Sequence, residues 1–575
     1  MKLLLLHCDY IKFKPLKKAL KSVGDLSEKE KKGEEVKEAL VVMTAVEKCD
    51  VDIGKVVEEY IKNIKDVASQ VKVKNIILYP YVHLSSNPSA PEIAVGVLDE
   101  AEKKLNKDFK VSRAPFGYYK EFEIKVKGHP LSELSREIVI GGGSHKVGLK
   151  EGSEKVYDYK QLLREISKTK LDTSKLKDND HRIIGQQMDL FSFSETAPGM
   201  VFWHNNGLII RNALIDFWRE IHREADYQEI RTPQILDKKL WQISGHWEKY
   251  KENIFLTNYD NREFAVKPMN CPGGMLIFKN NPKSYRDLPL RVGELGNVHR
   301  QELSGVLGGL FRVIQFTQDD AHIYCTEMQM EEEVGNALSL LNLIYQKFDF
   351  KVDHVELSTR PKKRIGSDEQ WDKAENVLEK VLKKKKIKFK INKGDGAFYG
   401  PKIDFHVKDS LNRTWQCGTF QLDFAMPERF ELEYTDKDNS RKMPVMIHRT
   451  IYGSVERFLG ILIESTRGRL PTWLAPVQVR VLSFTDKNVA YGKKVVKELK
   501  KKIPNLRIEE DFRNTTVSAK VKDAEIMRVP YIIVVGDREE KSKSLAVRVR
   551  GDKKIQNFGI EKFEEKIKKE IEDRK

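Results

Sequence analysis

The sequence is poor in cysteine, has no long apolar run and carries no acidic excess, and each absence excludes a class of protein. It has 575 residues and five widely spaced cysteines: Cys8, Cys49, Cys271, Cys325 and Cys417. A secreted disulfide framework uses an even set of cysteines in a small chain, so we expect a reducing, cytoplasmic compartment. The longest apolar run near the start covers only residues 3–6. A membrane span needs ~20 apolar residues, so we expect no membrane association.

Charge and composition indicate several folded domains. Apolar residues make up 40% of the chain and charged residues 33%, which excludes a disordered tail protein. At about 150 residues per domain, the length predicts three or four domains. The net charge is +17, and residues 476–575 hold 26 Lys and Arg against 17 Asp and Glu. Charge alone leaves open a nucleic-acid partner or a lysine-rich solvated surface, but this basic segment is the first candidate for binding a phosphate backbone.

Hydrophobic patterning divides the chain into three regions with a polar connector. The first region ends at the glycine run 141–143, and we expect the residues from there to about 189 to form a connector with some helix. The second region, to about residue 474, predicts a large antiparallel sheet with helices, and the third predicts a small α/β domain with a mixed sheet. We expect strands at residues 3–6, 39–45, 76–79, 229–232, 414–423, 478–482, 506–509 and 531–535. We expect helices at residues 56–71, 214–225, 375–386, 490–500, 517–528 and 561–573, with lysines 383–386 solvated.

Three separated arginines could bind a triphosphate. Arg300 stands beside Glu302, a glycine-bearing loop follows, and then comes Arg312; Arg457 lies farther on, after a small-residue turn. The planar guanidinium fork matches phosphate oxygens. A lone Arg-x-Glu is more simply a surface ion pair, so the nucleotide interpretation requires the fold to bring the arginines together.

These segments resemble the three motifs of the class II aminoacyl-tRNA synthetases, and within that class the threonyl-tRNA synthetase family. Motif 1 is similar to residues 227–233 (YQEIRTP), motif 2 to 298–302 (VHRQE) and 311–313 (FRV), and motif 3 to 450–458 (TIYGSVERF). The family strings are 269–274 (MNCPGG), 316–322 (FTQDDAH), 395–402 (DGAFYGPK), 414–419 (TWQCGT) and 448–449 (HR). All of them stand in the family order.

The resemblance implies a zinc site that spacing alone would not reveal. Cys271, His322 and His448 match the family ligands, although a lone buried histidine is usually a hydrogen-bonded core residue. One thiolate and two imidazoles would hold one Zn²⁺ per subunit and leave a coordination position open. A zinc ion binding the amino group and the hydroxyl of threonine would reject the near-isosteric valine, with Asp320 holding the hydroxyl further. Serine lacks only the methyl group of threonine, which is worth ~1–3 kcal/mol of binding free energy. A second site that removes serine after activation, a second sieve, is therefore needed.

The N-terminal region resembles that sieve, the archaeal threonyl-tRNA synthetase editing domain, related in fold to D-aminoacyl-tRNA deacylases. The matching strings are 81–86 (YVHLSS), 114–120 (APFGYYK) and 127–134 (KGHPLSEL). The resemblance implies a pocket lined by His83, Tyr119, Lys120, His129 and Glu133. From composition alone the aromatic stretch is as well explained by core packing. Position 45 is Ala, where related domains often carry Ser, so the side-chain contacts of those domains are not carried over to this position.

The resemblance also implies a two-step reaction with ATP, Mg²⁺, L-threonine and tRNA(Thr). Arg300, Arg312 and Arg457 would offset the charge developing on the α-phosphate. Further site residues implied by position, around threonine, the adenylate or the tRNA end, are Glu302, Gln318, Tyr399, Lys402, Gln416, Thr419 and His246. In the editing pocket, Lys120, peptide groups and the tRNA 2′-hydroxyl would orient a water. The C-terminal region resembles an anticodon-binding domain, with Arg513, Asn514, Lys520 and Arg528 in its matching stretch.

The expected organisation is therefore an α/β and α+β multidomain chain. We expect an editing domain at residues 1–145, a connector at 146–189, a class II catalytic domain at 190–474 and an anticodon-binding domain at 475–575. Motif 1 implies a homodimer. Two alternatives stay open: a catalytically silent relative that binds tRNA or regulates translation, and a hydrolase that mainly clears mischarged tRNA.

Overall fold

The computed structural model describes residues 1–20, 23–48, 50, 52–85, 87–138, 159–166, 176–260 and 262–575. The glycine run 141–143, most of the predicted connector, Cys49 and Ser86 lie outside these residues. The chain divides into two compact units, Met1–Glu151 and Gly152–Lys575. Within the described residues, no helix combines the length and the apolar character that crossing a membrane requires.

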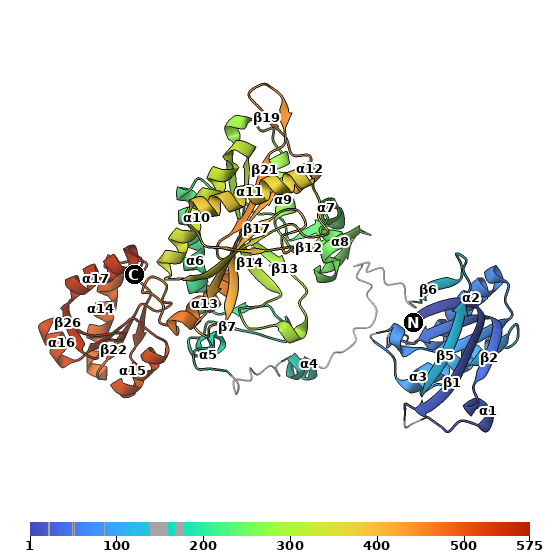
Figure 1. Ribbon diagram of the computed structural model, residues 1–575. Coiled ribbons are helices and arrows are strands. Elements are labelled where there is room, and N and C mark those ends of the chain that lie inside the picture. Colours follow the sequence, from blue (N-terminus) through green and yellow to red (C-terminus); the bar gives the residue numbers. More distant parts are fainter. Residues whose placement is uncertain are drawn as a thin grey trace. The chain divides into compact units, whose positions relative to one another are not determined.

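The first unit is a six-stranded sheet covered by two long helices (Figure 1). Its strands run in the order β4-β3-β2-β1-β5, with β6 also paired to β1. Neighbours among β2, β3 and β4 are parallel, whereas β1 is antiparallel to its partners. The elements are β1 (Lys2–Lys18), α1 (Glu28–Lys31), β2 (Glu34–Ala45), α2 (Ile53–Val71), β3 (Asn75–Pro80), α3 (Pro91–Leu105), β4 (Lys110–Arg113), β5 (Tyr118–Val126) and β6 (Glu133–Glu137).

Apolar periodicity explains why α2 packs as it does. Val56, Tyr60, Ile64 and Val67 repeat at intervals of three or four residues and are buried, so one face of the helix covers the sheet. Asp52 caps its first turn by accepting from the backbone N–H of Lys55. The predicted strands of this region lie inside β1, β2 and β3, and the predicted helix lies inside α2.

The second unit contains an eight-stranded sheet in the order β16-β15-β17-β18-β21-β14-β13-β9. All neighbours are antiparallel except at the two edges, where β16 pairs with β15 and β9 pairs with β13 in parallel. The strands are β9 (Gln228–Glu229), β13 (Leu290–His299), β14 (Gln315–Cys325), β15 (Val352–Ser358), β16 (Lys390–Asn392), β17 (Lys402–Lys408), β18 (Thr414–Asp423) and β21 (Val445–Thr450). The predicted large antiparallel sheet is confirmed.

One face of this sheet carries the main hydrophobic core. Helices α6 (Asn205–Glu224), α10 (Met330–Lys347), α11 (Asp368–Lys384) and α13 (Val455–Thr466) contribute to it. Alternate residues of the strands, such as Ile323, Phe405 and Phe420, point into this core. Because side chains alternate along a strand, their neighbours point to the opposite face. That opposite face is the one that carries the candidate site.

Smaller elements complete this part of the unit. Helix α9 (Cys271–Lys279) and helix α12 (Ala425–Arg429) pack against the site face through Met275 and Met426. The others are α4 (Tyr159–Ile166), α5 (His181–Gln187), β7 (Phe191–Ser192), β8 (Phe202–Trp203), β10 (Ile235–Asp237), α7 (Lys238–Ile243), α8 (His246–Tyr250), β11 (Leu256–Tyr259), β12 (Arg262–Val266), β19 (Tyr434–Thr435) and β20 (Arg441–Lys442).

Four predictions differ from the structure in this region. Helix α11 begins at Asp368, seven residues before the predicted start. Helix α6 begins nine residues before the predicted start. The strand expected at residues 229–232 stops after Glu229 because the Thr232 N–H is taken by the Glu294 carboxylate instead of a neighbouring strand. The predicted connector contains some helix, as expected, but its end is packed into this unit, since His181 and Ile184 of α5 are buried.

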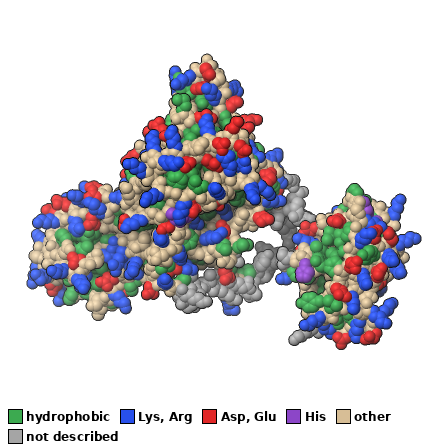
Figure 2. Space-filling model, viewed as in Figure 1, with side chains coloured by type: hydrophobic (Ala, Val, Ile, Leu, Met, Phe, Trp, Pro, Cys, Tyr) green, Lys and Arg blue, Asp and Glu red, His purple; other side chains and the backbone are tan. Residues whose placement is uncertain are grey.

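The C-terminal part is the predicted mixed sheet, in the order β23-β22-β24-β25-β26. The first three strands are parallel, and the antiparallel β25 and β26 are absent from the sequence-based prediction. Basic side chains are frequent on the face of this region drawn in Figure 2. Its elements are β22 (Val479–Ser483), α14 (Val489–Lys502), β23 (Ile508–Asp511), α15 (Val517–Ile526), β24 (Tyr531–Val535), α16 (Asp537–Ser542), β25 (Ser544–Val549), β26 (Ile555–Gly559) and α17 (Ile560–Glu572).

A buried ion pair joins the segment before α9 to β13. The ammonium of Lys267, fully buried, donates to the Glu294 carboxylate at 2.7 Å and to the Thr232 hydroxyl at 2.8 Å. We predict that Lys267→Met destabilises this core by about 3–5 kcal/mol, because it leaves a buried carboxylate without its cation. Urea denaturation of the full chain measures the change. Lys267→Met/Glu294→Gln should recover at least half of the loss, and equal stability of all three proteins would contradict the prediction.

Candidate functional site

A cavity of about 570 Å³ opens on the site face of the eight-stranded sheet. The sheet brings together side chains that are far apart in the sequence, from β14, β17, β18 and β21 and from the segments that flank them. Of the residues predicted from the sequence, it is lined by Cys271, Arg300, Glu302, Arg312, Gln318, Asp320, Tyr399, Lys402, Gln416, Thr419, His448 and Arg457. His322 and His246 are not in this wall.

A thiol and two imidazoles converge at one side of the cavity. Residues His322 of β14 and His448 of β21 stand directly opposite each other in the strand ladder, and Cys271 begins α9. One ligand atom of each of the three side chains lies within 4.8 Å of the others. The set is buried, with His322 only 2% exposed.

The hydrogen bonds around this cluster fit a metal ion. The Nε2 atom of His322 is buried without a hydrogen-bond partner among the described residues. The Nε2 atom of His448 lies 2.8 Å from the Asp423 carboxylate, which also accepts from the backbone N–H groups of Ala425 and Met426. A carboxylate behind a ligating histidine fixes the ring and leaves its other nitrogen for the metal. Thiolate and neutral imidazoles are the donors that Zn²⁺ takes.

The three predicted arginines occupy the other side of the cavity. The Arg312 guanidinium pairs with Glu302 at 2.9 Å. Arg457 donates to the backbone oxygens of Phe311 and Gln416, both at 3.0 Å. Arg300 lies over the Phe316 ring. Burial lowers the pKa of Arg300 and of Arg457, and in the described chain neither has a carboxylate within ion-pair distance. Two half-buried guanidinium groups without an ion-pair partner suit an anion such as phosphate.

A carboxylate that sequence reasoning missed holds the floor of the cavity. Asp404 of β17 accepts from Lys402 at 2.7 Å and from Thr419 at 2.8 Å, and also from the Gln416 amide. Lys402 makes a second contact, to Asp395 at 3.1 Å. Asp404 is 2% exposed. The three predicted residues are therefore fixed in one arrangement through an acid that was not itself predicted.

Asp319 and Asp320 are adjacent in β14 and point to opposite faces. Asp320 lines the cavity, where it accepts from the Asn270 amide at 3.3 Å. Asp319 accepts from three backbone N–H groups, those of Ile451, Tyr452 and Gly453, at 2.8 to 2.9 Å. Burial still raises the pKa of Asp319 to about 6. Asp319 thus fixes the turn that precedes α13 and Arg457.

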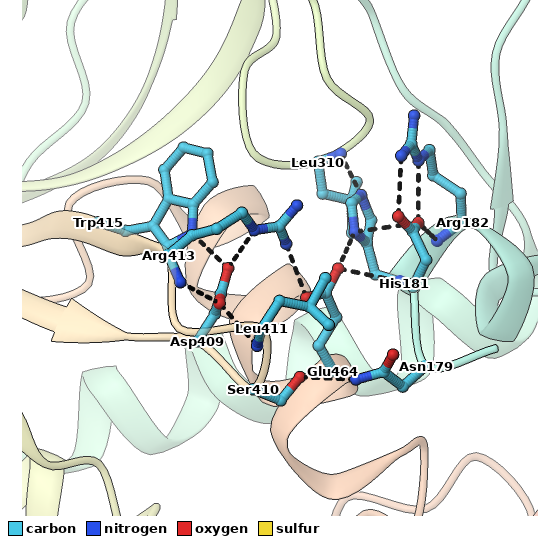
Figure 3. A network of polar contacts seen from close by, with 11 residues as sticks. Asn179, His181, Arg182, Leu310, Asp409, Ser410, Leu411, Arg413, Trp415 and Glu464 are labelled. Atoms are coloured by element: carbon cyan, nitrogen blue, oxygen red, sulfur yellow. Dashed lines mark hydrogen bonds and ion pairs between the residues drawn. The ribbon is translucent and has the colours of Figure 1, made fainter. Parts of the chain in front are cut away.

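A second polar network holds the loop between Arg300 and Arg312 (Figure 3). His181 of α5 accepts at Nε2 from the Leu310 N–H, 2.9 Å away, so its Nδ1 donates to Glu464 of α13, 2.8 Å away. Arg413 bridges the same Glu464 and Asp409. Phe311 stacks on Trp415 with ring centroids 4.6 Å apart. His181 falls in the predicted connector, which is why sequence reasoning missed it.

The first unit has its own cavity, of about 580 Å³. His83, Tyr119 and Lys120 line it, as does Ala45. The Lys120 ammonium donates to the backbone oxygens of Pro115 at 2.9 Å and Tyr118 at 3.1 Å. It also lies 5.3 Å from the centre of the Tyr79 ring. Burial lowers the pKa of Lys120 to about 8.

Comparison with known proteins places these two sites in one family. The "Archaea-specific editing domain of threonyl-tRNA synthetase" matches residues 1–138, the "tRNA synthetase class II core domain (G, H, P, S and T)" matches 255–466, and the "Anticodon binding domain" matches 478–570. The solved "RNA binding domain of Threonyl-tRNA synthetase" from Cryptosporidium parvum Iowa II is 41% identical, with a TM-score of 0.66, and the match covers 68% of this chain and 98% of that one. The chain belongs to the threonyl-tRNA synthetase family.

Other members of the threonyl-tRNA synthetase family are similar over the same share of the chain. The threonine–tRNA ligase of Clostridium botulinum is 54% identical over 398 residues, 69% of this chain and 62% of that protein. The chain therefore spans less than two thirds of the length of such curated relatives. A solved putative threonyl-tRNA synthetase from Aeropyrum pernix is 30% identical, with a TM-score of 0.60, over 68% of this chain and 96% of that one. The predicted family and fold class are confirmed.

Some of the site residues that the family resemblance implied do not line either cavity. His246 is fully buried behind Phe398 and Tyr399, and burial lowers its pKa to about 3. His129 and Glu133 do not line the cavity of the first unit. The β5–β6 connection places the Nε2 atom of His129 2.7 Å from the His7 ring, and Glu133 pairs with Leu6 in the strand ladder.

The C-terminal part also corrects a prediction. Lys520 is 2% exposed and donates to Ser483, so its ammonium is used inside the fold rather than offered to RNA. Arg513 is held by Asp511 and Asp523. Arg528 does line a cavity of about 710 Å³, together with four arginines that were not predicted: Arg467, Arg469, Arg548 and Arg550.

We predict that Lys120 titrates near pH 8, whereas solvated lysines titrate near 10.4. Because its folded pKa lies below its unfolded pKa, the stability of this unit should rise as the pH increases from about 8 to 10.5. NMR of the reductively ¹³C-methylated protein measures the titration, and Lys120→Arg assigns the resonance. A spectrum in which every lysine titrates near pH 10 would contradict this environment.

Proposed function

We propose that the chain is a threonine–tRNA ligase that activates L-threonine with ATP, transfers it to tRNA(Thr) and hydrolyses mischarged seryl-tRNA(Thr). The supporting observation is that Cys271 and His448, two members of the Cys271–His322–His448 cluster, line the same cavity as the three arginines. The metal-ligand residues could bind an amino acid and the arginines a triphosphate, so both substrates would lie in the same cavity. Retention of all these residues argues against a silent relative, and the built catalytic cavity argues against a hydrolase alone.

In the first step, a carboxylate oxygen of threonine attacks the α-phosphorus of ATP, and the bond to pyrophosphate breaks. Arg300 and Arg457 are placed to offset the charge that develops on the phosphate, since among the described residues neither forms an ion pair with a carboxylate. Arg312 is oriented by Glu302. Mg²⁺ bound with ATP would neutralise further phosphate charge. In the second step, a terminal ribose hydroxyl of the tRNA attacks the threonyl carbonyl and releases AMP.

Selection of threonine would depend on polar groups around the metal cluster. Zn²⁺ held by Cys271, His322 and His448 would supply a Lewis acid with an open coordination position. Asp320 lies 3.7 Å from the Nε2 atom of His322 and is oriented by Asn270, so it can accept from the threonine hydroxyl. Valine offers no hydroxyl and would leave these groups unpaired. A site built for a hydroxyl rejects such an analogue strongly.

Serine keeps the hydroxyl and would pass this first selection, so hydrolysis falls to the first unit. His83, Tyr119 and Lys120 surround a cavity with apolar walls that include Ala45 and Pro80. We propose that Lys120, with peptide groups and the tRNA 2′-hydroxyl, orients the water that cleaves the seryl ester. The basic C-terminal part would hold the tRNA through Arg528 and its neighbours. We also propose that the chain forms a homodimer and acts in the cytoplasm.

We predict that Cys271→Ala loses zinc and loses threonine activation by more than ~10²-fold, since even outer-shell changes at a metal site cost 10–100-fold. Metal analysis beside threonine-dependent ATP–pyrophosphate exchange measures both. Cys325→Ala is the matched control, because Cys325 is also buried but lies in the hydrophobic core. An active Cys271→Ala protein would remove this cluster from the mechanism.

We predict that Lys120→Ala charges tRNA with threonine at the normal rate but accumulates seryl-tRNA. Charging assays with radiolabelled threonine and serine measure both products. Lys127→Ala is the control, because Lys127 pairs with Asp9 and Glu38 and does not line the cavity. If seryl-tRNA is cleared as fast as by the unsubstituted protein, Lys120 has no part in editing.

A further inference from the structure

A second group of metal-ligand side chains lies on the same sheet, apart from the cavity wall. His354 and Glu356 come from β15 and His406 comes from β17. His354 and His406 are direct partners in the ladder, and Glu356 is paired with Asp404. Their neighbours Val355, Leu357 and Phe405 point into the core, so the three polar side chains share the opposite face. One ligand atom of each lies within 4.8 Å of the others.

The two rings and the carboxylate already face one another. The imidazoles stack with centroids 4.3 Å apart and an interplanar angle of 7°. The Nε2 atoms of His354 and His406 lie 3.5 Å and 3.9 Å from the two oxygens of Glu356. Ligands bound to one tetrahedral ion at 2.0–2.1 Å stand ~3.4 Å apart, so only a small closure is needed.

Second-layer contacts orient these groups as in known metal sites. The Nδ1 atom of His354 lies 2.8 Å from the Asp353 carboxylate, which Lys408 holds at 2.8 Å. Donation from Nδ1 leaves the Nε2 lone pair of His354 directed at the group. The Asn392 amide donates to Glu356 at 3.0 Å. The side chains are between 19% and 28% exposed, so an ion from solvent can reach them.

We propose that His354, Glu356 and His406 bind a divalent transition-metal ion, Zn²⁺ by preference, at a site separate from Cys271, His322 and His448. Two imidazoles and one carboxylate are a zinc donor set that leaves room for a water, and Co²⁺, Ni²⁺ and Cu²⁺ also accept such ligands. Strand β18 lies between β17 and β21 and thus separates the two groups. The ion would join β15 to β17 two residues beyond Asp404, which holds Lys402, Gln416 and Thr419.

Cobalt titration of the chelator-treated full chain tests this site, because a thiolate–Co²⁺ absorption band reports only binding at Cys271. We expect two equivalents of bound Co²⁺ in the unsubstituted protein. His354→Ala and His406→Ala should each bind one and keep the thiolate band, and Glu356→Gln should weaken the second equivalent at least tenfold. The control His204→Ala, which changes a histidine paired with Asp189, should bind two. A single equivalent in the unsubstituted protein, or a second one that survives both His354→Ala and His406→Ala, overturns the proposal.

The Cys271→Ala chain isolates this site from the thiolate site, and its own metal binding does not depend on how the histidine variants fold. It should bind one equivalent of Co²⁺ without a thiolate band, and Cys271→Ala/His406→Ala should bind none. Bound Co²⁺ should also raise the melting temperature of the Cys271→Ala chain, since an ion that binds only the folded state stabilises it. No binding by Cys271→Ala, or equal binding by the double variant, contradicts the site.

Discussion

The register of strand β14 is the constraint on which the candidate site depends. Paired with β13 and β21, it sets His322 opposite His448 and Gln318 opposite Gly296. A slip of one residue would turn every side chain to the other face, placing Asp320 in the core and Ile323 in the cavity. Asp319 stabilises this register from the core side. Its carboxylate accepts hydrogen bonds from three backbone N–H groups directly after β21.

Buried carboxylates hold the other side chains of the candidate site in place. Asp423 orients His448, Asp404 gathers Lys402, Gln416 and Thr419, and Glu464 joins His181 to Arg413. Each of these acids is at most 2% exposed. Hydrogen bonds made away from water are strong when every partner is satisfied. These buried carboxylates therefore hold the side chains that line the cavity. In the same cavity, Arg300 and Arg457 form no ion pair with a carboxylate of the described chain.

Sequence patterning predicted much of the architecture, and the family motifs predicted much of the site. Strand 414–423 has the predicted bounds although its apolar alternation changes phase at Cys417, where the ladder with β17 shifts register. Strand β9 is short because the Thr232 N–H bonds to a side chain instead of a strand. Asp404, Asp423 and Glu464 stand in no ligand motif, so only the folded structure shows their partners. The burial of Lys520 and the position of His129 outside the wall of the first unit's cavity likewise depend on contacts between segments that local pattern does not encode.

The distinction between threonine and valine tests the central claim most directly. ATP–pyrophosphate exchange by the zinc-loaded, unsubstituted chain should depend on threonine, proceed more weakly with serine and be lower with valine by ~10⁴-fold or more, as in sites that reject an analogue lacking a required hydroxyl. Exchange that is absent with threonine, or similar for threonine and valine, would contradict the account.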